Sequence, residues 1–266
     1  MINKIHYDLV IKKDDFLDAK PFPYLVLDNF FTPKFFERLN VYLNKVKKTS
    51  DIKKFSSSVE NEKTIFLNQN ISLIEDIAKN LSDEKWLNNI RELTKISDLN
   101  APDINHGSLS NYHEMNQNGV LGSHVDHAIH PKTRSKHVLN IIIYLNKNWH
   151  HEYGGNTLLY DLKGKKIIKK IEYIPNRAVI FLHTPYSFHG VDKITKQTNE
   201  KRKSFYIDYY SDLQNPYQTF NLDFPKNFFS HGTTFVFQNV LEYLKIKNFN
   251  YTKTLLKYNF NKFINR

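Results

Sequence analysis

Short hydrophobic runs dominate this 266-residue chain between about residue 108 and residue 210. The runs are rich in Val, Ile, Leu and Phe, and Gly, Asp and Asn separate them, which is typical of β-strands joined by turns. Many short strands separated by turn signals predict a mainly β fold with flanking helices and a double-stranded β-helix core, a jelly roll of cupin-like form. We expect core strands at residues 108–112, 121–126, 137–145, 156–160, 166–171, 178–182, 189–191 and 203–210. Turns are expected at residues 117–119 and 161–165.

Before residue 106 the apolar residues follow helical spacing in two places. Thr32 and Pro33 are the residue types preferred at an N-cap and at the first helical position, so a helix should begin there. Residues 71–96 indicate two helices, the second starting near Asp83, because acidic residues suit a helix N-terminus. We expect the other N-terminal segments to be a loose strand and turn, an edge strand and a polar loop, at residues 1–20, 21–28 and 49–61.

The length and the continuous pattern favour a single domain over residues 1–266. Within it we distinguish a supporting N-terminal part (1–105), the jelly-roll core (106–212) and a C-terminal extension (213–266). The extension interleaves aromatic residues with Pro and Asn, and helical spacing returns at 234–243 and 251–263. We interpret it as a packing element that closes the barrel or forms a dimer contact. The alternative is a cap that recognises substrate.

His124, Val125 and Asp126 form a spacing that can bind a metal. Side chains alternate along a strand, so His124 and Asp126 share one face. His189, at the start of a later strand, can supply a third ligand. Two imidazoles and one carboxylate on one face leave coordination positions open, a set that suits non-haem Fe(II).

Other histidines give similar local patterns, and their context separates them from this one. His6-Tyr7-Asp8 precedes any expected core strand, and His150-His151-Glu152 lies in a polar turn. His127 and His130 follow the motif, and we expect them to be surface or substrate-side residues because three protein ligands suffice. His183 is expected to have a structural role at a strand end.

The last core strand carries a candidate anion-binding residue. Arg202, Ser204, Tyr206 and Asp208 share one face, while the alternate residues form an apolar face that should pack on helices. A buried Arg needs an anionic partner, and a guanidinium binds a carboxylate in a bidentate manner. Lys203 lies on the apolar face and is expected to extend to solvent.

These motifs together resemble the 2-oxoglutarate- and Fe(II)-dependent dioxygenases, and within them the prolyl-4-hydroxylase-like group. The resemblance rests on motifs that cover about a third of the chain, in order. They are His124-Val125-Asp126, Tyr144-Leu145-Asn146 with Trp149, Gly154-Gly155, Ile180-Phe181, His189-Gly190-Val191 and Arg202-x-Ser204. The interval from His189 to Arg202 is slightly longer than in many relatives, and Lys201 and Lys203 flank the Arg.

The resemblance implies a cofactor set and a reaction. Fe(II) would be held by His124, Asp126 and His189, and 2-oxoglutarate by Arg202 and Ser204. Tyr144 and Tyr112 are further candidates for contact with the co-substrate. With O2, such an enzyme would hydroxylate an unactivated C–H bond of an amino acid, a peptidyl residue or a small biosynthetic intermediate and release succinate and CO2. The alternatives are an oxygenase acting on nucleic acid and a non-catalytic jelly-roll binding module.

The composition bears on the class of partner and on the cellular compartment, but it does not indicate the substrate. The formal net charge of +11 could indicate a polyanionic partner, but the Lys residues are dispersed, whereas a nucleic-acid footprint is usually clustered. The chain has no Cys, which excludes disulfides and thiolate chemistry. No apolar run approaches membrane-spanning length and the N-terminus lacks an apolar signal region, so we expect a cytoplasmic protein without a membrane partner. The sequence does not indicate an oligomeric state.

Overall fold

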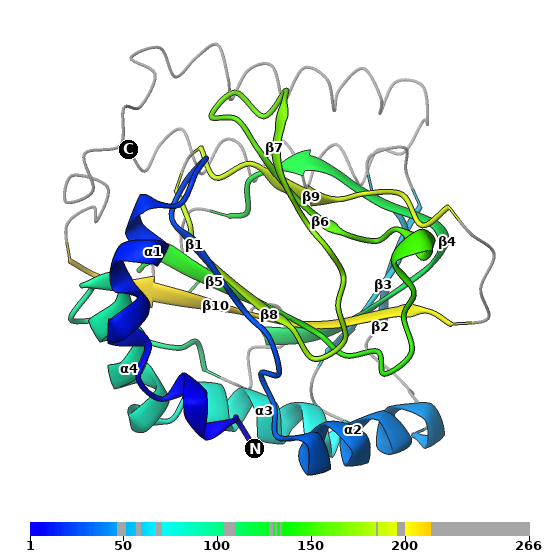
Figure 1. Cartoon of the computed structure of the whole chain (residues 1–266), viewed down its shortest axis with the longest axis horizontal. Coiled ribbons are helices and arrows are strands. Elements are labelled where there is room, and N and C mark those ends of the chain that lie inside the picture. The colour runs from blue at the N-terminus through cyan, green and yellow to red at the C-terminus, as the bar shows by residue number, and fades with distance from the viewer. Residues whose placement is uncertain are drawn as a thin grey trace.

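The computed structural model describes residues 1–46, 52–56, 60–67, 71–103, 110–127, 130, 132–133, 135–184, 186–195 and 200–213. These residues form a curled, antiparallel ten-stranded sheet supported by a few helices (Figure 1). The main path through the sheet follows the order β1-β8-β5-β10-β4-β9-β6-β7, and β3 joins β2 to β4. This architecture is the predicted jelly roll. The expected helices at 234–243 and 251–263 lie outside the described residues.

The strands and helices have the following bounds. The strands are β1 Tyr24–Leu27, β2 Ile52–Ser56, β3 Glu60–Leu67, β4 Ser110–His124, β5 Lys136–Tyr144, β6 Thr157–Tyr160, β7 Ile167–Ile171, β8 Ala178–Leu182, β9 His189–Val191 and β10 Arg202–Ser211. The helices are α1 Lys13–Asp18, α2 Pro33–Lys45, α3 Ser72–Leu81 and α4 Glu84–Thr94, with 3-10 turns η1 Lys4–His6, η2 Leu9–Lys12 and η4 His151–Tyr153. Within the described residues, no helix is long and apolar enough to span a bilayer.

The helix starts agree with the sequence expectations. Helix α2 begins at Pro33, although the Thr32 side chain makes no capping hydrogen bond. Helix α4 begins at Glu84, and the Asp83 carboxylate accepts a hydrogen bond from the Trp86 backbone N–H. That bond satisfies one of the N–H groups that every helix N-terminus leaves without an intrahelical partner.

The N-terminal segments differ from the expectations. Residues 1–20 contain η1, η2 and α1 rather than a strand, because Leu9 and Phe16 are fully buried in the core that also holds the helices. The expected loop at 49–61 includes strand β2 and the start of β3. Strand β2 is mostly exposed and rich in Lys, so it lacks an apolar alternation and is held by its antiparallel ladder to β3.

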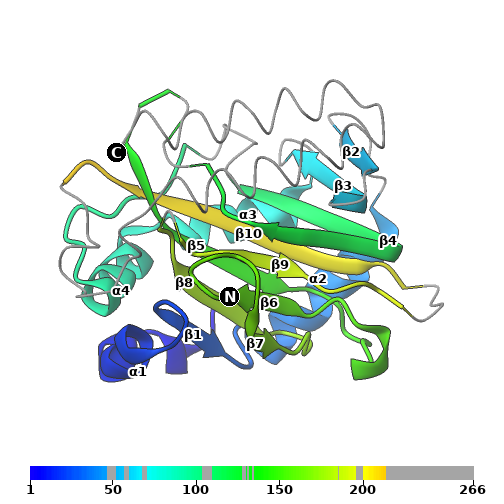
Figure 2. The ribbon, with the colours of Figure 1, turned by 90° about the horizontal axis from the view of Figure 1, so that it is seen from above.

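The largest difference between the predicted and the observed topology lies in strand β4. The expected turn at 117–119 is absent, and the backbone continues as one strand from Ser110 to His124. Asn118 has a φ of 65°, which marks an irregularity rather than a chain reversal. The first part of β4 pairs with β10 and the last part with β9, so β4 connects both sides of the barrel. Figure 2 shows β4 and β10 side by side across the molecule.

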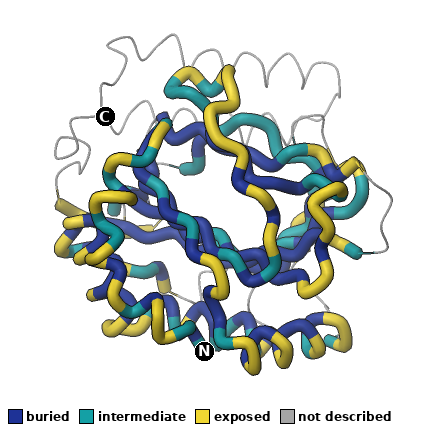
Figure 3. The backbone as a smooth tube through the Cα atoms, in the orientation of Figure 1, coloured by how far each residue is buried: buried dark blue, intermediate teal, exposed yellow. Residues whose placement is uncertain are grey.

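Two apolar layers lie on opposite faces of the central strands. On the outer face, Phe205, Ile207 and Tyr209 of β10 join the core that includes α2, α3 and α4. On the inner face, Tyr144 and Phe181 belong to a second core inside the barrel. The central strands are accordingly buried along most of their length, while the helices expose their outer sides (Figure 3). Polar side chains of the inner face therefore lie in a protected interior.

Candidate metal and co-substrate site

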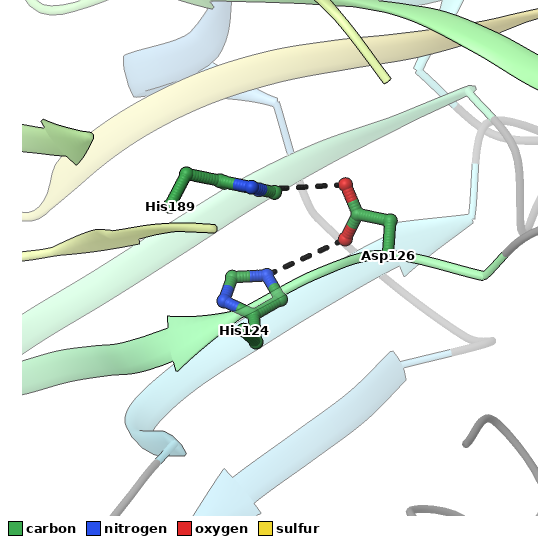
Figure 4. A group of neighbouring side chains, drawn as sticks. All are labelled: His124, Asp126 and His189. Atoms are coloured by element: carbon green, nitrogen blue, oxygen red, sulfur yellow. Dashed lines mark ion pairs between the residues drawn. The ribbon is translucent and has the colours of Figure 1, made fainter. Parts of the chain in front are cut away.

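The three predicted metal ligands converge at one point of the barrel. His124 ends β4 and His189 begins β9, and the two residues are directly paired across these strands. Asp126 follows β4 by two residues. Its Oδ1 lies 3.4 Å from His124 Nε2, and its Oδ2 lies 3.4 Å from His189 Nε2. Figure 4 shows the two rings and the carboxylate pointing toward one another. One ligand atom from each residue lies within 4.8 Å of the others, so the group can hold a metal ion.

The two imidazole rings are oriented for metal binding. His124 Nδ1 lies 2.9 Å from the Gly122 carbonyl oxygen, and His189 Nδ1 lies 3.0 Å from the Ser187 carbonyl oxygen. Each contact places a proton on Nδ1 and leaves the Nε2 lone pair facing Asp126. Metal-ligating histidines almost always donate their other ring N–H in this way, because the bond fixes the tautomer and the ring orientation.

The surroundings keep Asp126 in the charge state that a metal ligand requires. Burial by itself would raise the pKa of this carboxyl, but His189 and His124 outweigh it and hold the pKa well below its usual range. The carboxylate also accepts a hydrogen bond of 2.9 Å from Asn140 Nδ2. An ionised carboxylate between two imidazole Nε2 atoms is a donor set that fits Fe(II).

Arg202 lies on the inner face of β10 and is only 3% exposed. Its Nε donates to the Gly155 carbonyl oxygen at 2.6 Å, and its Nη1 donates to Ser204 Oγ at 3.1 Å. The guanidinium carbon lies 4.8 Å from the Tyr173 ring centroid and 5.4 Å from that of Tyr144. Among the described residues, no carboxylate forms an ion pair with Arg202. A buried cation without an acidic side-chain partner is suited to an anionic ligand.

The two flanking lysines have other surroundings. Lys201 has a side chain that is 53% exposed and pairs with Glu114 at 3.0 Å. Lys203 faces the other side of the sheet, where its Nζ donates to Asn44 Oδ1 at 2.6 Å, rather than extending freely to solvent. The strand alternation therefore selects Arg202 as the cation of the inner face.

The motif residues between β5 and β6 build the wall around Arg202. Asn146 accepts a hydrogen bond of 2.7 Å from the Lys203 backbone N–H and donates to the Lys201 carbonyl oxygen at 2.8 Å, so it fixes the backbone on both sides of the Arg. Trp149 Nε1 donates to the Gly154 carbonyl oxygen at 3.0 Å. At Gly155, where φ is +75°, a Cβ would lie 2.9 Å from Arg202 Cδ. Glycine is therefore needed here for both backbone conformation and space.

The two tyrosines proposed from the sequence lie in different layers. Tyr144 is inside the barrel, where its hydroxyl donates to Thr157 Oγ1 at 2.6 Å and its ring stacks on Tyr173. Tyr112 lies in the outer layer, where its ring packs on Phe66 and its hydroxyl donates to Glu114 Oε1 at 2.8 Å. The structure therefore does not bring Tyr112 to the site, and we do not retain it as a co-substrate ligand.

His113 is an inner-face residue that the sequence reasoning missed. It pairs directly across from Ser204, and its ring lies 4.6 Å from that of Tyr206. Its Nε2 is buried and has no hydrogen-bond partner among the described residues. Burial lowers the pKa of His113 well below its usual range, and the charges of Lys63 and Arg202 lower it further, so the ring is neutral. Only the register of β4 against β10, which the sequence does not show, identifies His113 as a residue of the inner face.

Comparisons with known proteins agree with this geometry. Residues 108–208 match the family model of the 2OG-Fe(II) oxygenase superfamily. The match extends over the strands that carry the metal cluster and Arg202. A comparison with curated proteins found no match.

Several solved structures share the fold at low sequence identity. A prolyl-4-hydroxylase from Pseudomonas putida is 12% identical, with a TM-score of 0.54 over 77% of this chain and 99% of that one. A prolyl hydroxylase from Trichoplax adhaerens, in complex with a hypoxia inducible factor peptide fragment, is 14% identical, with a TM-score of 0.52 over 79% and 90%. The epimerase SnoN from nogalamycin biosynthesis is 11% identical, with a TM-score of 0.54 over 79% and 84%.

The solved structures share the jelly-roll fold with this chain, and the family match indicates the class of protein that the site suits. Residues 108–208 match the model of the 2OG-Fe(II) oxygenase superfamily, and this match supports a 2-oxoglutarate-dependent dioxygenase that uses Fe(II), 2-oxoglutarate and O2.

Proposed function

We propose that His124, Asp126 and His189 hold Fe(II), and that Arg202 and Ser204 bind the distal carboxylate of 2-oxoglutarate. The observation that carries this assignment is the orientation of the two rings, each with Nδ1 against a backbone carbonyl and Nε2 toward Asp126. The buried guanidinium of Arg202 supports the co-substrate position independently of the metal cluster.

The residues of the chain have distinct parts in this function. Three protein ligands leave positions for the co-substrate and O2. Arg202 offers directed N–H donors that match a carboxylate, and the rings of Tyr144 and Tyr173 form apolar walls that fix the guanidinium. Arg202 and Ser204 are each only 3% exposed, so little bulk water competes for the guanidinium, which strengthens its contact with a carboxylate. When bound, Fe(II) with 2-oxoglutarate supplies the oxidative chemistry.

We propose that the reaction is hydroxylation of an unactivated C–H bond in an amino acid, a peptidyl residue or a small biosynthetic intermediate, with release of succinate and CO2. Structural neighbours with prolyl hydroxylase activity support this outcome, and one of them holds a peptide fragment.

The first test is anaerobic reconstitution with Fe(II) and 2-oxoglutarate. The wild-type protein should develop the weak visible charge-transfer band of a metal-chelated 2-oxoglutarate, and His189→Ala should lose it. His151→Ala is a matched control, because His151 is exposed in η4 and belongs to the alternative His-rich motif. If folded wild type binds Fe(II) but shows no band with 2-oxoglutarate, the co-substrate assignment is wrong. If His189→Ala keeps the full band, the ligand assignment is wrong.

The second test addresses the reaction. Under O2, the wild type should convert 2-oxoglutarate to succinate, and candidate amino acids and peptides should gain 16 Da, measured by mass spectrometry. Asp126→Gly should lose this hydroxylation. A protein that binds 2-oxoglutarate but produces no succinate with any candidate would favour the non-catalytic binding module instead.

A further inference from the structure

A second group of two histidines and one aspartate lies beside the proposed iron ligands. Asp208 Oδ2 is 3.7 Å from His127 Nε2, and Asp208 Oδ1 is 3.5 Å from His137 Nε2. One ligand atom from each residue lies within 4.8 Å of the others. Residue types and spacing would therefore suit a second metal ion as well as they suit the first.

The hydrogen bonds of this second group differ from those of the first. Both ring nitrogens of His137 face carbonyl oxygens, Nδ1 that of His127 at 3.0 Å and Nε2 that of Leu139 at 3.2 Å. His127 Nε2 lies 2.7 Å from the hydroxyl of Tyr210. A metal ligand needs one ring nitrogen directed at an open position. His124 and His189 meet this condition and His137 does not.

Asn140 connects the two groups. It is 2% exposed and lies directly opposite Asp208 in the β5–β10 ladder. Its Nδ2 donates to Asp126 Oδ2 at 2.9 Å and to Asp208 Oδ1 at 3.2 Å. One amide nitrogen carries two protons, so it can serve both carboxyl groups. The bridge therefore ties a proposed iron ligand, which lies just beyond the end of β4, to the paired strands β5 and β10 within the sheet.

The orientation of this amide is determined by its neighbours. The reversed amide would place the carbonyl oxygen of Asn140 against the two carboxyl groups. In the observed orientation, Oδ1 is buried and has no hydrogen-bond partner among the described residues. A buried acceptor without a hydrogen-bond partner is unfavourable, because it has lost its bonds to water. The contact that requires an amide at this position is therefore the hydrogen bond from Asn140 Nδ2 to Asp126.

We propose that Asn140 is a positioning residue that holds Asp126 in the orientation for binding the metal, and that the group formed by His127, His137 and Asp208 anchors Asn140 rather than binding a second ion. This inference rests on the proposed role of Asp126. Residues that orient metal ligands typically contribute about 10- to 100-fold to metal affinity. Loss of the Asn140 amide should therefore weaken metal binding by a factor in that range.

The experiment measures the affinity and stoichiometry of Fe(II), or of Mn(II) as a redox-stable substitute, in the full-length wild type and in Asn140→Ala and Asn140→Leu. The wild type should bind one equivalent, and both variants should bind it about 10- to 100-fold more weakly. Leu has the same number and branching of side-chain heavy atoms as Asn and keeps the interior filled, so it covers the case in which the Ala variant does not fold. His137→Phe should still bind one equivalent in the folded protein.

Controls separate positioning from general destabilisation. Asn89 is also a buried Asn with two hydrogen bonds, to Leu9 and His6, but it belongs to α4. Asn89→Ala should lower the melting temperature of the metal-free protein without changing metal affinity. Wild-type affinity in a folded Asn140 variant overturns the inference, and so does a second equivalent in wild type that disappears in His137→Phe. A wild type that binds no metal would instead overturn the proposed function.

Discussion

At the residue scale, hydrogen bonding distinguishes residues of the same type. The chain has 12 His, and spacing alone makes several of them plausible ligands. The carbonyl contacts at Nδ1 of His124 and His189 leave the Nε2 atoms directed at Asp126, whereas carbonyls face both nitrogens of His137. These hydrogen bonds thus distinguish the proposed iron site from the second group of two histidines and one aspartate.

The same scale gives a prediction for the co-substrate anchor. Arg202→Leu should weaken 2-oxoglutarate binding by about tenfold to hundredfold, because hydrogen bonds to charged groups contribute about 1.5–3 kcal/mol. Fe(II) affinity should stay within about twofold of wild type, since Arg202 is not a proposed ligand. Titration of the charge-transfer band with 2-oxoglutarate measures both effects.

Lys201→Ala is the matched control for this substitution. Lys201 precedes the Arg in sequence but is largely exposed, so its removal should leave 2-oxoglutarate affinity unchanged. A large loss in Lys201→Ala together with normal binding in Arg202→Leu would transfer the anchor role to the lysine.

At the element scale, β10 has two faces with separate functions. Arg202, Ser204 and Asp208 face the interior, and Tyr209 faces the helices. The Tyr209 hydroxyl accepts from Trp86 Nε1 at 3.1 Å and donates to the Leu81 carbonyl oxygen at 2.8 Å. The strand therefore joins the helical layer to the site through residues that are adjacent in sequence.

This separation predicts that stability and binding can be changed independently. Tyr209→Phe should lower the free energy of unfolding by about 1–3 kcal/mol, because it leaves two buried polar groups without their partner. Metal and 2-oxoglutarate affinities should not change, although Asp208 directly precedes Tyr209 in the sequence. Denaturant unfolding measures the first quantity and band titration the second. Unchanged stability, or a parallel loss of affinity, would contradict the two-face description of β10.

At the scale of the whole molecule, the site joins both sides of the barrel. The proposed ligands come from β4, from the segment directly after it and from β9, and the proposed anchor comes from β10, which pairs with the other end of β4. A metal ion bound here would link strands across the barrel in the folded state only.

Ligand binding should therefore stabilise the whole fold. Mn(II) with 2-oxoglutarate should raise the melting temperature in a concentration-dependent manner, since a ligand at 100 times its Kd adds about 2.7 kcal/mol. Thermal unfolding of wild type and Asp126→Ala, each with and without EDTA, tests this. The variant should show no metal-dependent rise. An equal rise in the variant would place the stabilising metal elsewhere in the chain.

The sequence by itself determined the order of most core strands and the helix starts at Pro33 and Glu84. The close spacing of His124 and Asp126 predicted that they point to one site, which holds although Asp126 lies two residues beyond the end of β4. The sequence also determined that Arg202 faces opposite to Lys203. These features follow from alternation along one strand and from capping preferences within one turn. Both are local, so a single chain segment carries the information.

Tertiary structure decided the features that depend on pairing between distant segments. The continuity of β4 through Asn118 follows from its successive ladders to β10 and β9, and the same register places Tyr112 in the outer layer and His113 inside. The contact of Asn140 with Asp208, 68 residues later in the chain, also requires the β5–β10 register. A shift of one residue in register would move each of these side chains to the other face. Strand pairing, not local pattern, therefore determined which polar residues surround the proposed metal ligands.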